Sequence, residues 1–346
     1  MEYIISVIKE GGNLMKKILV AIVTILCALA IFLIIYFGRE DRNDELTTIR
    51  VAEVAHSVFY APKYVAINNG YFEDEGIRIE SILTPGADRV TAAVLSGDVD
   101  IGFCGPEASI YIYKQGEVDY IQTFAGLTIR DGSFIVGREP NPDFTLDDLK
   151  GKHIIGGRKG GMPNMTLQWT IRQAGIHPTE DMIMDTSIDF AAMSGAFISG
   201  IGDYVTLFEP TATNLENEGL GYVLASVGKL GGEMPYVGYN ARKSFIEENE
   251  DLLQRFTNAI QRGLDFVNNN ESREIAEAIA RSFPDASIND LIMFIDRYKE
   301  AQVWGENTYI SEETFNHLQN VMIYAGELDE KVPYENLIFT RFMSDN

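Results

Sequence analysis

The chain has 346 residues, of which 46% are hydrophobic and 23% charged, as in a folded protein with room for two domains. Its formal net charge of −23 argues against nucleic acid or an anionic membrane surface as a partner, because both attract basic surfaces. The four histidines and two cysteines show no H-x-x-H or C-x-x-C spacing, so we expect neither a metal site nor a cofactor.

The first predicted element is an apolar segment, residues 18–37, that carries no charge and is long enough to cross a bilayer as a helix. Lys16 and Lys17 precede it, and basic flanks stay in the cytoplasm, so we expect the rest of the chain on the extracytoplasmic side. Residues 15–38 are therefore assigned to a membrane anchor or signal segment, and residues 39–48 to a tether. Lipidation at Cys27 and cleavage of the segment are the alternatives.

Residues 1–14 precede Met15-Lys16-Lys17, which is a conventional opening for a membrane signal. The stretch Lys9-Glu10-Gly11-Gly12 is what a purine-rich ribosome-binding site would encode a few codons before Met15. We interpret residues 1–14 as a misassigned translation start.

Short strands and helices alternate after the tether, which predicts an α/β fold whose sheets are mostly parallel and flanked by helices. A first lobe is expected over residues 49–135 and 237–346, with its strands at 49–55, 77–83, 99–104, 118–127 and 236–240. Its helices are expected at 62–72, 88–96 and 106–114, and C-terminal helices at 244–268, 272–282, 287–302 and 311–325.

A second lobe is expected over residues 136–236, with strands at 153–157, 183–188, 203–208 and 222–227. Helices at 165–174, 190–199 and 210–218 alternate with these strands. The chain passes between the lobes near residues 133–138 and returns near residues 232–240. Two such crossings form a hinge that can close the lobes on a ligand.

A repeated segment supports this two-lobed organisation. Residues 93–107, AVLSGDVDIGFCGPE, and residues 196–210, AFISGIGDYVTLFEP, share A-x-[LI]-S-G-x-x-D, a short apolar strand, and a turn holding Glu and Pro. Each copy reads as a helix, a Gly stop, a strand and a Pro-started helix. Ligands of parallel α/β sheets bind beyond the carboxyl ends of the strands, so both turns are expected to face one cleft.

Four segments resemble the solute-binding proteins of ABC importers in the nitrate/sulfonate/taurine and thiamine-pyrimidine-precursor family. These segments are FYAPKYVAINNGYFEDEGIRIE (59–80), SGDVDIGFCGPEA (96–108), FTLDDLKGKHIIGGRKGGMP (144–163) and SGIGDYVTLFEP (199–210). The resemblance covers residues 49–340 and implies a two-lobed periplasmic-binding-protein-like fold of type II. It also implies a receptor that passes its solute to a permease and a separate ATPase, and this chain has no P-loop of its own.

The candidate ligand-binding residues of the first lobe follow its first and third strands. They are His56, Ser57, Phe59, Tyr60, Cys104, Gly105 and Glu107. An aromatic ring here can stack on a planar ligand, and the free N–H groups at the start of a helix attract acceptors. Glu107 either contacts the ligand or satisfies those N–H groups as a first-turn acid. Cys104 has no neighbouring His or triad pattern, so we do not expect a nucleophile there.

The candidates of the second lobe and the crossings are Thr128, Gly161, Met162, Asn164, Phe208, Glu209 and Tyr236. The glycines after the strand at 153–157 allow a close approach of backbone to ligand. Glu209 is expected to point its carboxylate into the cleft, which would favour N–H donors or cations and disfavour sulfonate or nitrate. Arg130 could pair with Glu107 or Glu209 and cancel that preference.

The leading hypothesis is a monomeric, membrane-anchored receptor that delivers a small organic solute, such as a pyrimidine or thiamine-precursor-like heterocycle, to an ABC importer. The first alternative is a binding protein for sulfonate, taurine or nitrate anions. The second is an enzyme similar to thiamine-pyrimidine synthases, which resemble this chain but carry a Cys-rich segment. Outside the apolar segment the chain has Cys104 alone, so we expect no enzyme activity.

Overall fold

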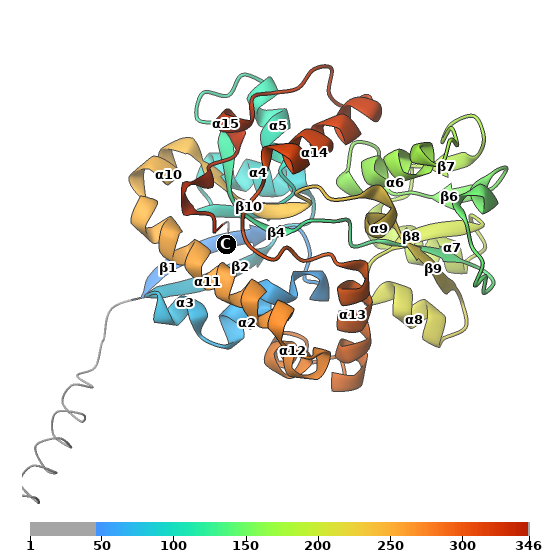
Figure 1. Cartoon of the computed structure of the whole chain (residues 1–346), viewed down its shortest axis with the longest axis horizontal. Helices are drawn as coiled ribbons and strands as arrows, with labels where there is room; N and C mark the ends of the chain where they lie inside the picture. The colour runs from blue at the N-terminus through green and yellow to red at the C-terminus, as the bar shows by residue number, and fades with distance from the viewer. Residues whose placement is uncertain (1–45, 345–346) are drawn as a thin grey trace, which may run out of the picture. The chain divides into compact units, whose positions relative to one another are not determined.

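The computed structural model describes residues 46–344. The predicted misassigned start (1–14), the membrane anchor (15–38), Cys27 and most of the tether (39–48) lie outside the described residues. Within residues 46–344, no helix combines the length and the apolar character that a bilayer crossing requires. This part of the chain contains two five-stranded sheets with helices around them (Figure 1).

The first sheet has the strand order β2-β1-β3-β10-β4 and forms what we call lobe one. Its strands are β1 (Thr47–Glu53), β2 (Ile77–Leu83), β3 (Ile101–Cys104), β4 (Ile121–Thr128) and β10 (Val237–Arg242). Strand β1 is parallel to β2 and β3, whereas β10 is antiparallel to both β3 and β4. Every residue of β3 and β4 is buried: β3 lies at the centre of the sheet, and the edge strand β4 is covered by residues 334–337 and 340–342 of the C-terminal segment.

The helices of lobe one before the first crossing are α2 (Ala61–Asn68), α3 (Tyr71–Asp74), α4 (Ala87–Ser96) and α5 (Glu107–Lys114). A short 3₁₀ helix, η1 (Val58–Tyr60), precedes α2, and the Ser57 side chain caps it by accepting the Phe59 N–H. Helix α4 ends at Gly97, whose left-handed backbone (φ +80°) turns the chain into β3. The strand expected from residue 118 begins three residues later, because Val118 lies exposed in the turn after α5.

The second sheet has the order β7-β6-β8-β5-β9 and forms lobe two. Its strands are β5 (Phe134–Gly137), β6 (His153–Ile155), β7 (Ile183–Asp185), β8 (Tyr204–Leu207) and β9 (Tyr222–Ser226). Its helices are η2 (Leu146–Leu149), α6 (Met162–Gln173), η3 (Phe190–Ala192), α7 (Met193–Ile198), α8 (Thr211–Asn217) and α9 (Val227–Gly231). The pairing repeats that of lobe one: β6 is parallel to β7 and β8, and β5 is antiparallel to β8 and β9.

The repeated segment of the sequence occupies equivalent places in the two sheets. Gly97 and Gly200 both adopt positive φ angles (+80° and +101°) after α4 and α7. The strands that follow, β3 and β8, each lie next to the antiparallel strand of their sheet. The expectation of two similar α/β lobes with mostly parallel sheets is therefore confirmed.

Two chain crossings join the lobes and hydrogen-bond to each other. The first runs from β4 to β5 and the second from α9 to β10. The Tyr236 N–H donates to the Thr128 carbonyl (2.9 Å), and the Met234 N–H donates to the Ile129 carbonyl (2.8 Å). A Cβ atom at Gly228 would lie 2.1 Å from the Asp131 carbonyl, so only glycine permits the crossings to come this close.

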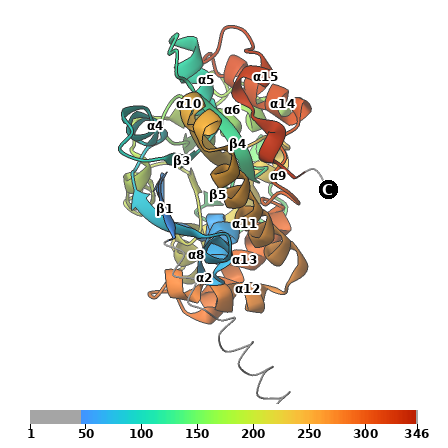
Figure 2. The same cartoon turned by 90° about the vertical axis from the view of Figure 1, so that its left-hand side faces the viewer.

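The C-terminal helices pack on lobe one and also contact lobe two. They are α10 (Lys243–Glu248), α11 (Glu250–Asn269), α12 (Ser272–Ile279), η4 (Ala280–Ser282), α13 (Ile288–Ala301), α14 (Glu312–Tyr324), α15 (Tyr334–Leu337) and η5 (Thr340–Phe342). Helix α11 lies on the outer side of lobe one, toward the viewer in Figure 2. Helix α14 contacts α6 of lobe two, where the rings of His317 and Trp169 lie 5.3 Å apart.

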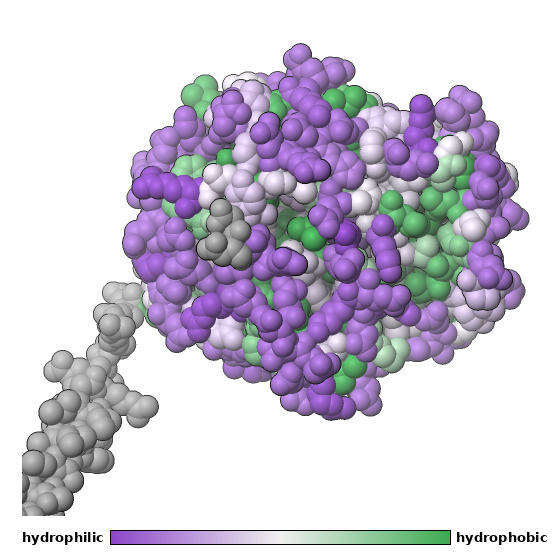
Figure 3. Space-filling model, in the orientation of Figure 1, coloured by the Kyte–Doolittle hydropathy of each residue, from purple (hydrophilic) through white to green (hydrophobic). Residues whose placement is uncertain are grey.

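The face seen in Figure 3 is mostly hydrophilic, with a hydrophobic area on the side of lobe two. Large hydrophobic side chains exposed on lobe two include Phe190, Ile198, Ile201 and Leu220. Hydrophilic surface elsewhere on this face agrees with the high net charge of −23.

A glycine in α11 provides a test of how closely the helices pack. A Cβ atom at Gly263 would lie 2.2 Å from the Pro62 carbonyl oxygen of α2, so backbone would have to move. We expect Gly263→Ala to lower the free energy of unfolding by about 1–3 kcal/mol, as overpacking does.

The matched control is Gly195→Ala in α7, where a Cβ atom would meet no atom within 4 Å. That substitution is expected to raise the free energy of unfolding by about 0.5–1 kcal/mol through helix propensity. Urea denaturation of both variants measures the difference. Equal effects of the two substitutions would contradict the close packing of α11 on α2.

Candidate functional site

A cleft of about 1040 Å³ lies between the two lobes. Its walls come from the segments that follow β1, β3, β6 and β8, from the starts of α4 and η3, and from the second crossing. The residues of these walls that the sequence predicted are His56, Ser57, Phe59, Tyr60, Gly105, Glu107, Gly161, Met162, Phe208, Glu209 and Tyr236. The strand ends of both sheets thus meet at one cavity, as expected for parallel α/β lobes.

Aromatic rings from three chain segments form one wall of the cleft. The Phe59 ring lies 5.4 Å from Tyr60, 5.6 Å from Phe208 of lobe two and 5.9 Å from Tyr236 of the second crossing. The Trp304 indole N–H donates to the Phe59 carbonyl (2.8 Å) and fixes this segment against the C-terminal helices. This aromatic cluster makes the wall rigid, with Phe59, Tyr60 and Tyr236 almost fully buried and Phe208 partly buried.

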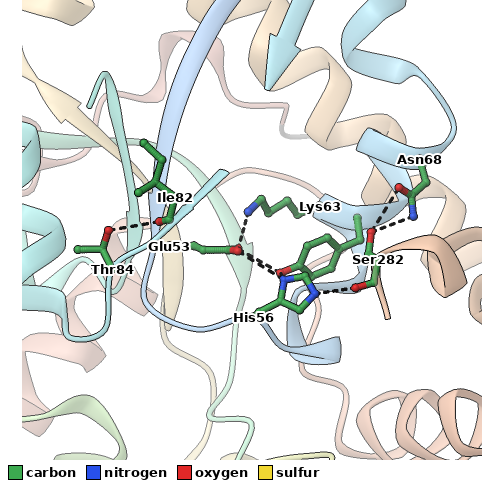
Figure 4. A network of polar contacts seen from close by, with 8 residues as sticks. Glu53, His56, Lys63, Asn68, Ile82, Thr84 and Ser282 are labelled. Carbon is green, nitrogen blue, oxygen red and sulfur yellow. Dashed lines mark hydrogen bonds and ion pairs between the residues drawn. The ribbon is translucent and has the colours of Figure 1, made fainter. Parts of the chain in front are cut away.

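His56 stands on the cleft wall, but both of its ring nitrogens already have partners (Figure 4). Its Nε2 lies 2.7 Å from the Ser282 carbonyl, and its Nδ1 lies 2.9 Å from the Tyr64 hydroxyl. Interaction with Glu53 raises the pKa of the imidazole above its usual value. The ring can contact a ligand through its face or edge, while its two nitrogens remain hydrogen-bonded to Ser282 and Tyr64.

Behind His56, a buried ion pair joins the end of β1 to α2. The Lys63 ammonium lies 2.5 Å from the Glu53 carboxylate, and the Tyr64 hydroxyl donates to the same carboxylate (3.1 Å). Burial alone would raise the pKa of Glu53, but contacts with His56, Lys63 and Tyr64 hold it below its usual value. This network fixes the segment that carries Ser57 and Phe59.

Glu107 begins α5 and is 5% exposed on the wall of lobe one. Its carboxylate folds back over Gly105, where a Cβ atom would lie 1.9 Å from Oε2. In the described part of the chain, Oε2 has no hydrogen-bond partner. Burial raises the pKa of this carboxyl to about 7, although the backbone N–H groups of Glu107 and Ala108 favour its ionised form.

The glycine-rich loop between β6 and α6 forms the facing wall. Gly157 and Gly160 have positive φ angles (+78° and +75°), which glycine adopts without strain. The Tyr111 hydroxyl of lobe one donates to the Gly160 carbonyl (3.2 Å), so this loop touches both lobes. At the cleft mouth Arg158 lies 3.7 Å from Asp88, and both side chains are largely exposed. Such an exposed ion pair contributes little to the free energy of folding.

Glu209 does not direct its carboxylate into the cleft as the sequence suggested. The carboxylate is fully buried and pairs with Arg297 of α13 at 2.7 Å. It also accepts the Thr213 hydroxyl (2.9 Å) and the Thr213 N–H (3.0 Å). A guanidinium from a distant helix therefore neutralises the acid on which the predicted preference for cations partly rested.

Three further candidates lie behind the walls rather than on them. The Asn240 amide donates to the Cys104 carbonyl (3.1 Å), and burial raises the pKa of the Cys104 thiol. The Thr128 hydroxyl accepts the Val237 N–H (3.0 Å), which is a hinge contact. The Asn164 amide turns back to donate to the Gly156 carbonyl (3.1 Å). These side chains shape the cleft from behind.

Arg130 pairs with neither Glu107 nor Glu209. It lies 2.7 Å from Glu233 and also donates to the Gln302 carbonyl and side chain. These contacts tie the first crossing to the second and to the end of α13.

Sequence reasoning missed several residues of the cleft region. Asp88, Tyr111, Phe190 and Met193 line the cleft, and Arg297 acts from outside it. Asp88 and Phe190 stand at predicted helix starts beside the cleft, a position that could have singled them out. Nothing local indicates Arg297, because its partner in the repeat lies 88 residues away. Within residues 46–344 no group of acidic, His or Cys side chains is arranged to hold a metal ion.

Comparisons with known proteins agree with this geometry. Residues 58–273 match the sequence model of the NMT1/THI5-like family. The putative binding protein YtlA of Bacillus subtilis (strain 168) is 39% identical over 312 residues, covering 90% of this chain and 93% of that protein.

Two solved structures share the fold at low sequence identity. The alkanesulfonate-binding protein SsuA of Xanthomonas axonopodis pv. citri, bound to MOPS, has a TM-score of 0.67 at 14% identity, over 85% of this chain and 98% of that one. The periplasmic nitrate-binding protein NrtA of Synechocystis PCC 6803 has a TM-score of 0.65 at 15% identity, over 86% and 87%. The family predicted from the sequence is confirmed: the chain belongs to the NMT1/THI5-like family of two-lobed solute-binding proteins.

Proposed function

We propose that this protein is the extracytoplasmic receptor of an ABC importer, which captures a small organic solute and delivers it to a permease with a separate ATPase. The observation that carries the proposal is the cleft of about 1040 Å³ where the strand ends of both sheets meet. Two hydrogen-bonded crossings connect the lobes beside that cleft, so the lobes can close about them. Family membership supports the same role.

The proposed solute is planar and carries an N–H donor, as in a pyrimidine or thiamine-precursor-like heterocycle. The aromatic wall of Phe59, Tyr60, Phe208 and Tyr236 supports a planar ligand. The unpartnered oxygen of Glu107 supports a donor. Proposed contacts are the faces of these rings, the side chains of Ser57, Glu107 and Met162, the backbone of Gly105 and Gly161, and the ring edge of His56.

Anion binding is the second candidate function, and it is supported by the ligands of two structural neighbours. Those neighbours are an alkanesulfonate-binding protein and a nitrate-binding protein. The start of α6 with its glycine-rich loop offers N–H groups that could receive an anion. A synthase-like enzyme is less favoured, because Cys104 is buried and burial raises the pKa of its thiol, which opposes nucleophilic attack.

We also propose that the protein is a monomer anchored by the uncleaved apolar segment at residues 18–37. A helix of that length would hold the binding lobes at the extracytoplasmic face of the cell membrane, where the permease lies. Neighbouring genes for a permease and an ATPase would support the receptor function, whereas a kinase gene would favour a third hypothesis, a ligand-binding sensor domain.

A thermal-shift screen of the full-length protein tests the function. The panel contains aminopyrimidines, other heterocycles, amines, taurine, alkanesulfonates and nitrate. We expect an aminopyrimidine or a related heterocycle to raise the melting temperature, since ligand at 100 times its Kd adds about 2.7 kcal/mol of stability. Stabilisation by sulfonates or nitrate alone would move the protein to the anion-binding class, and stabilisation by nothing in the panel would count against a solute receptor of either class.

Membrane attachment is expected to survive Cys27→Ala, because the apolar helix rather than a lipid holds the protein. Fractionation of cells that express each form measures the membrane-bound share. Release of the Cys27→Ala protein into the medium, with the unchanged protein retained, would establish a lipid anchor instead.

A further inference from the structure

The buried polar groups on the cleft walls differ in whether the protein itself supplies their partners. The carboxylate of Glu209 is occupied by Arg297 and Thr213, and both nitrogens of His56 have partners. In contrast, Glu107 Oε2 lacks a hydrogen-bond partner within residues 46–344, although the residue is only 5% exposed. Buried polar atoms without partners carry a free-energy cost that a ligand can remove.

The position of Glu107 gives its carboxylate a second effect. It lies at the N-terminal end of α5, an eight-residue helix, and folds over Gly105 beside the backbone N–H groups of Glu107 and Ala108. The N-terminal end of a helix is a favourable binding place for a ligand anion, because the helix dipole is positive there and the N–H groups are free. In lobe one the protein's own carboxylate already takes that place.

The charged and titratable groups facing Glu107 do little to neutralise it. They are Arg158 from the glycine-rich loop, Tyr111 on α5, Tyr60 on η1, Tyr236 on the second crossing and Cys104 at the end of β3. Arg158 is the cation of this set, and its exposed guanidinium lies at the mouth beside Asp88. Unlike Glu209, Glu107 therefore keeps its charge unpaired when it ionises.

We propose that Glu107 determines the charge class of the solute: it blocks the start of α5 to anionic groups and offers Oε2 to an N–H donor of a neutral or cationic ligand. This inference rests on the proposed receptor function and names the residue that sets its specificity. The Tyr236 hydroxyl interacts with the buried Asp131 carboxyl, so its ring rather than its hydroxyl is the part available to the ligand. The aromatic wall holds the plane of the ligand beside Glu107.

Matched probes test the inference in the full-length protein at pH 8. 4-Aminopyrimidine offers an N–H donor, 4-methylpyrimidine has the same shape without one, and ethanesulfonate is the anion. NMR titration is expected to give at least a ~10-fold preference for the amino compound, because a charge-assisted hydrogen bond is about twice as strong as a neutral one. In Glu107→Met the preference should fall below about 3-fold, and Glu107→Gln should retain part of it.

The anion gives the complementary result. Ethanesulfonate should bind Glu107→Ala, which uncovers the start of α5, at least ~10-fold more tightly than the limit measured for the unchanged protein. Glu117→Gln, an exposed acid of lobe one, controls for the change in net charge.

The failures of the inference and of the receptor function are distinguishable. If the probes bind but the amino preference and the sulfonate affinity are the same in all Glu107 variants, the inference is wrong and the receptor function stands. If no probe binds any variant, both lose their support.

A measurement without ligand tests the environment of Glu107. The native pKa of about 7 exceeds the ordinary value of 4.5, so the native state holds a proton that the unfolded state has lost between these pH values. Stability from this group is therefore lost as pH rises through about 7, and Glu107→Gln avoids that loss. We expect the melting temperature of Glu107→Gln to rise relative to the unchanged protein between pH 5 and pH 8. A difference that is constant with pH would contradict a buried unpaired carboxylate.

Discussion

Each sheet of this protein is completed by a strand that arrives from the other lobe. Strand β10 enters lobe one between β3 and β4, and β5 enters lobe two between β8 and β9. Both inserted strands are antiparallel to their neighbours, so neither lobe has a complete sheet without a crossing. The crossings must consequently lie side by side, and Thr128, Gly228 and Tyr236 make that approach possible. The hinge, the facing strand ends and the cleft all follow from this exchange.

The two lobes share a plan but use their repeated acids differently. Glu107 follows β3 and Glu209 follows β8, which are the strands of the repeated segment. Each of these strands lies next to the inserted strand of its sheet. Arg297 of the C-terminal helices reaches Glu209 and removes its charge from the cleft, while no cation does the same for Glu107 among the described contacts. The C-terminal helices thus act on the chemistry of the site as well as on the hinge. One acid holds lobe two against α13, and the other keeps an oxygen without a hydrogen-bond partner within residues 46–344.

Much of the fold could be predicted from the sequence, because it depends on local patterns. Alternating apolar strands, the glycine stops at Gly97 and Gly200, and the repeated segment together indicated two α/β lobes. Most of the residues predicted from positions after strand ends also lie on the cleft wall, although they form the smaller part of it. Side-chain direction was not accessible in this way: Asn164 turns back to Gly156, and Glu209 turns to a guanidinium 88 residues distant. Such choices depend on which long-range partner satisfies a buried polar group, and no local pattern encodes that partner.

The central claim is that the lobes close about the two crossings when solute enters. The distance between the lobes can be measured by double electron–electron resonance between spin labels at Val118 of lobe one and Ile183 of lobe two. Both residues are largely exposed. The labels are placed in full-length protein in which Cys27 is replaced by Ser, with Cys104 buried and protected. We expect the compound that stabilises the protein most to convert a broad distance distribution into a single narrow one. An unchanged distribution at saturating ligand would contradict a hinged receptor.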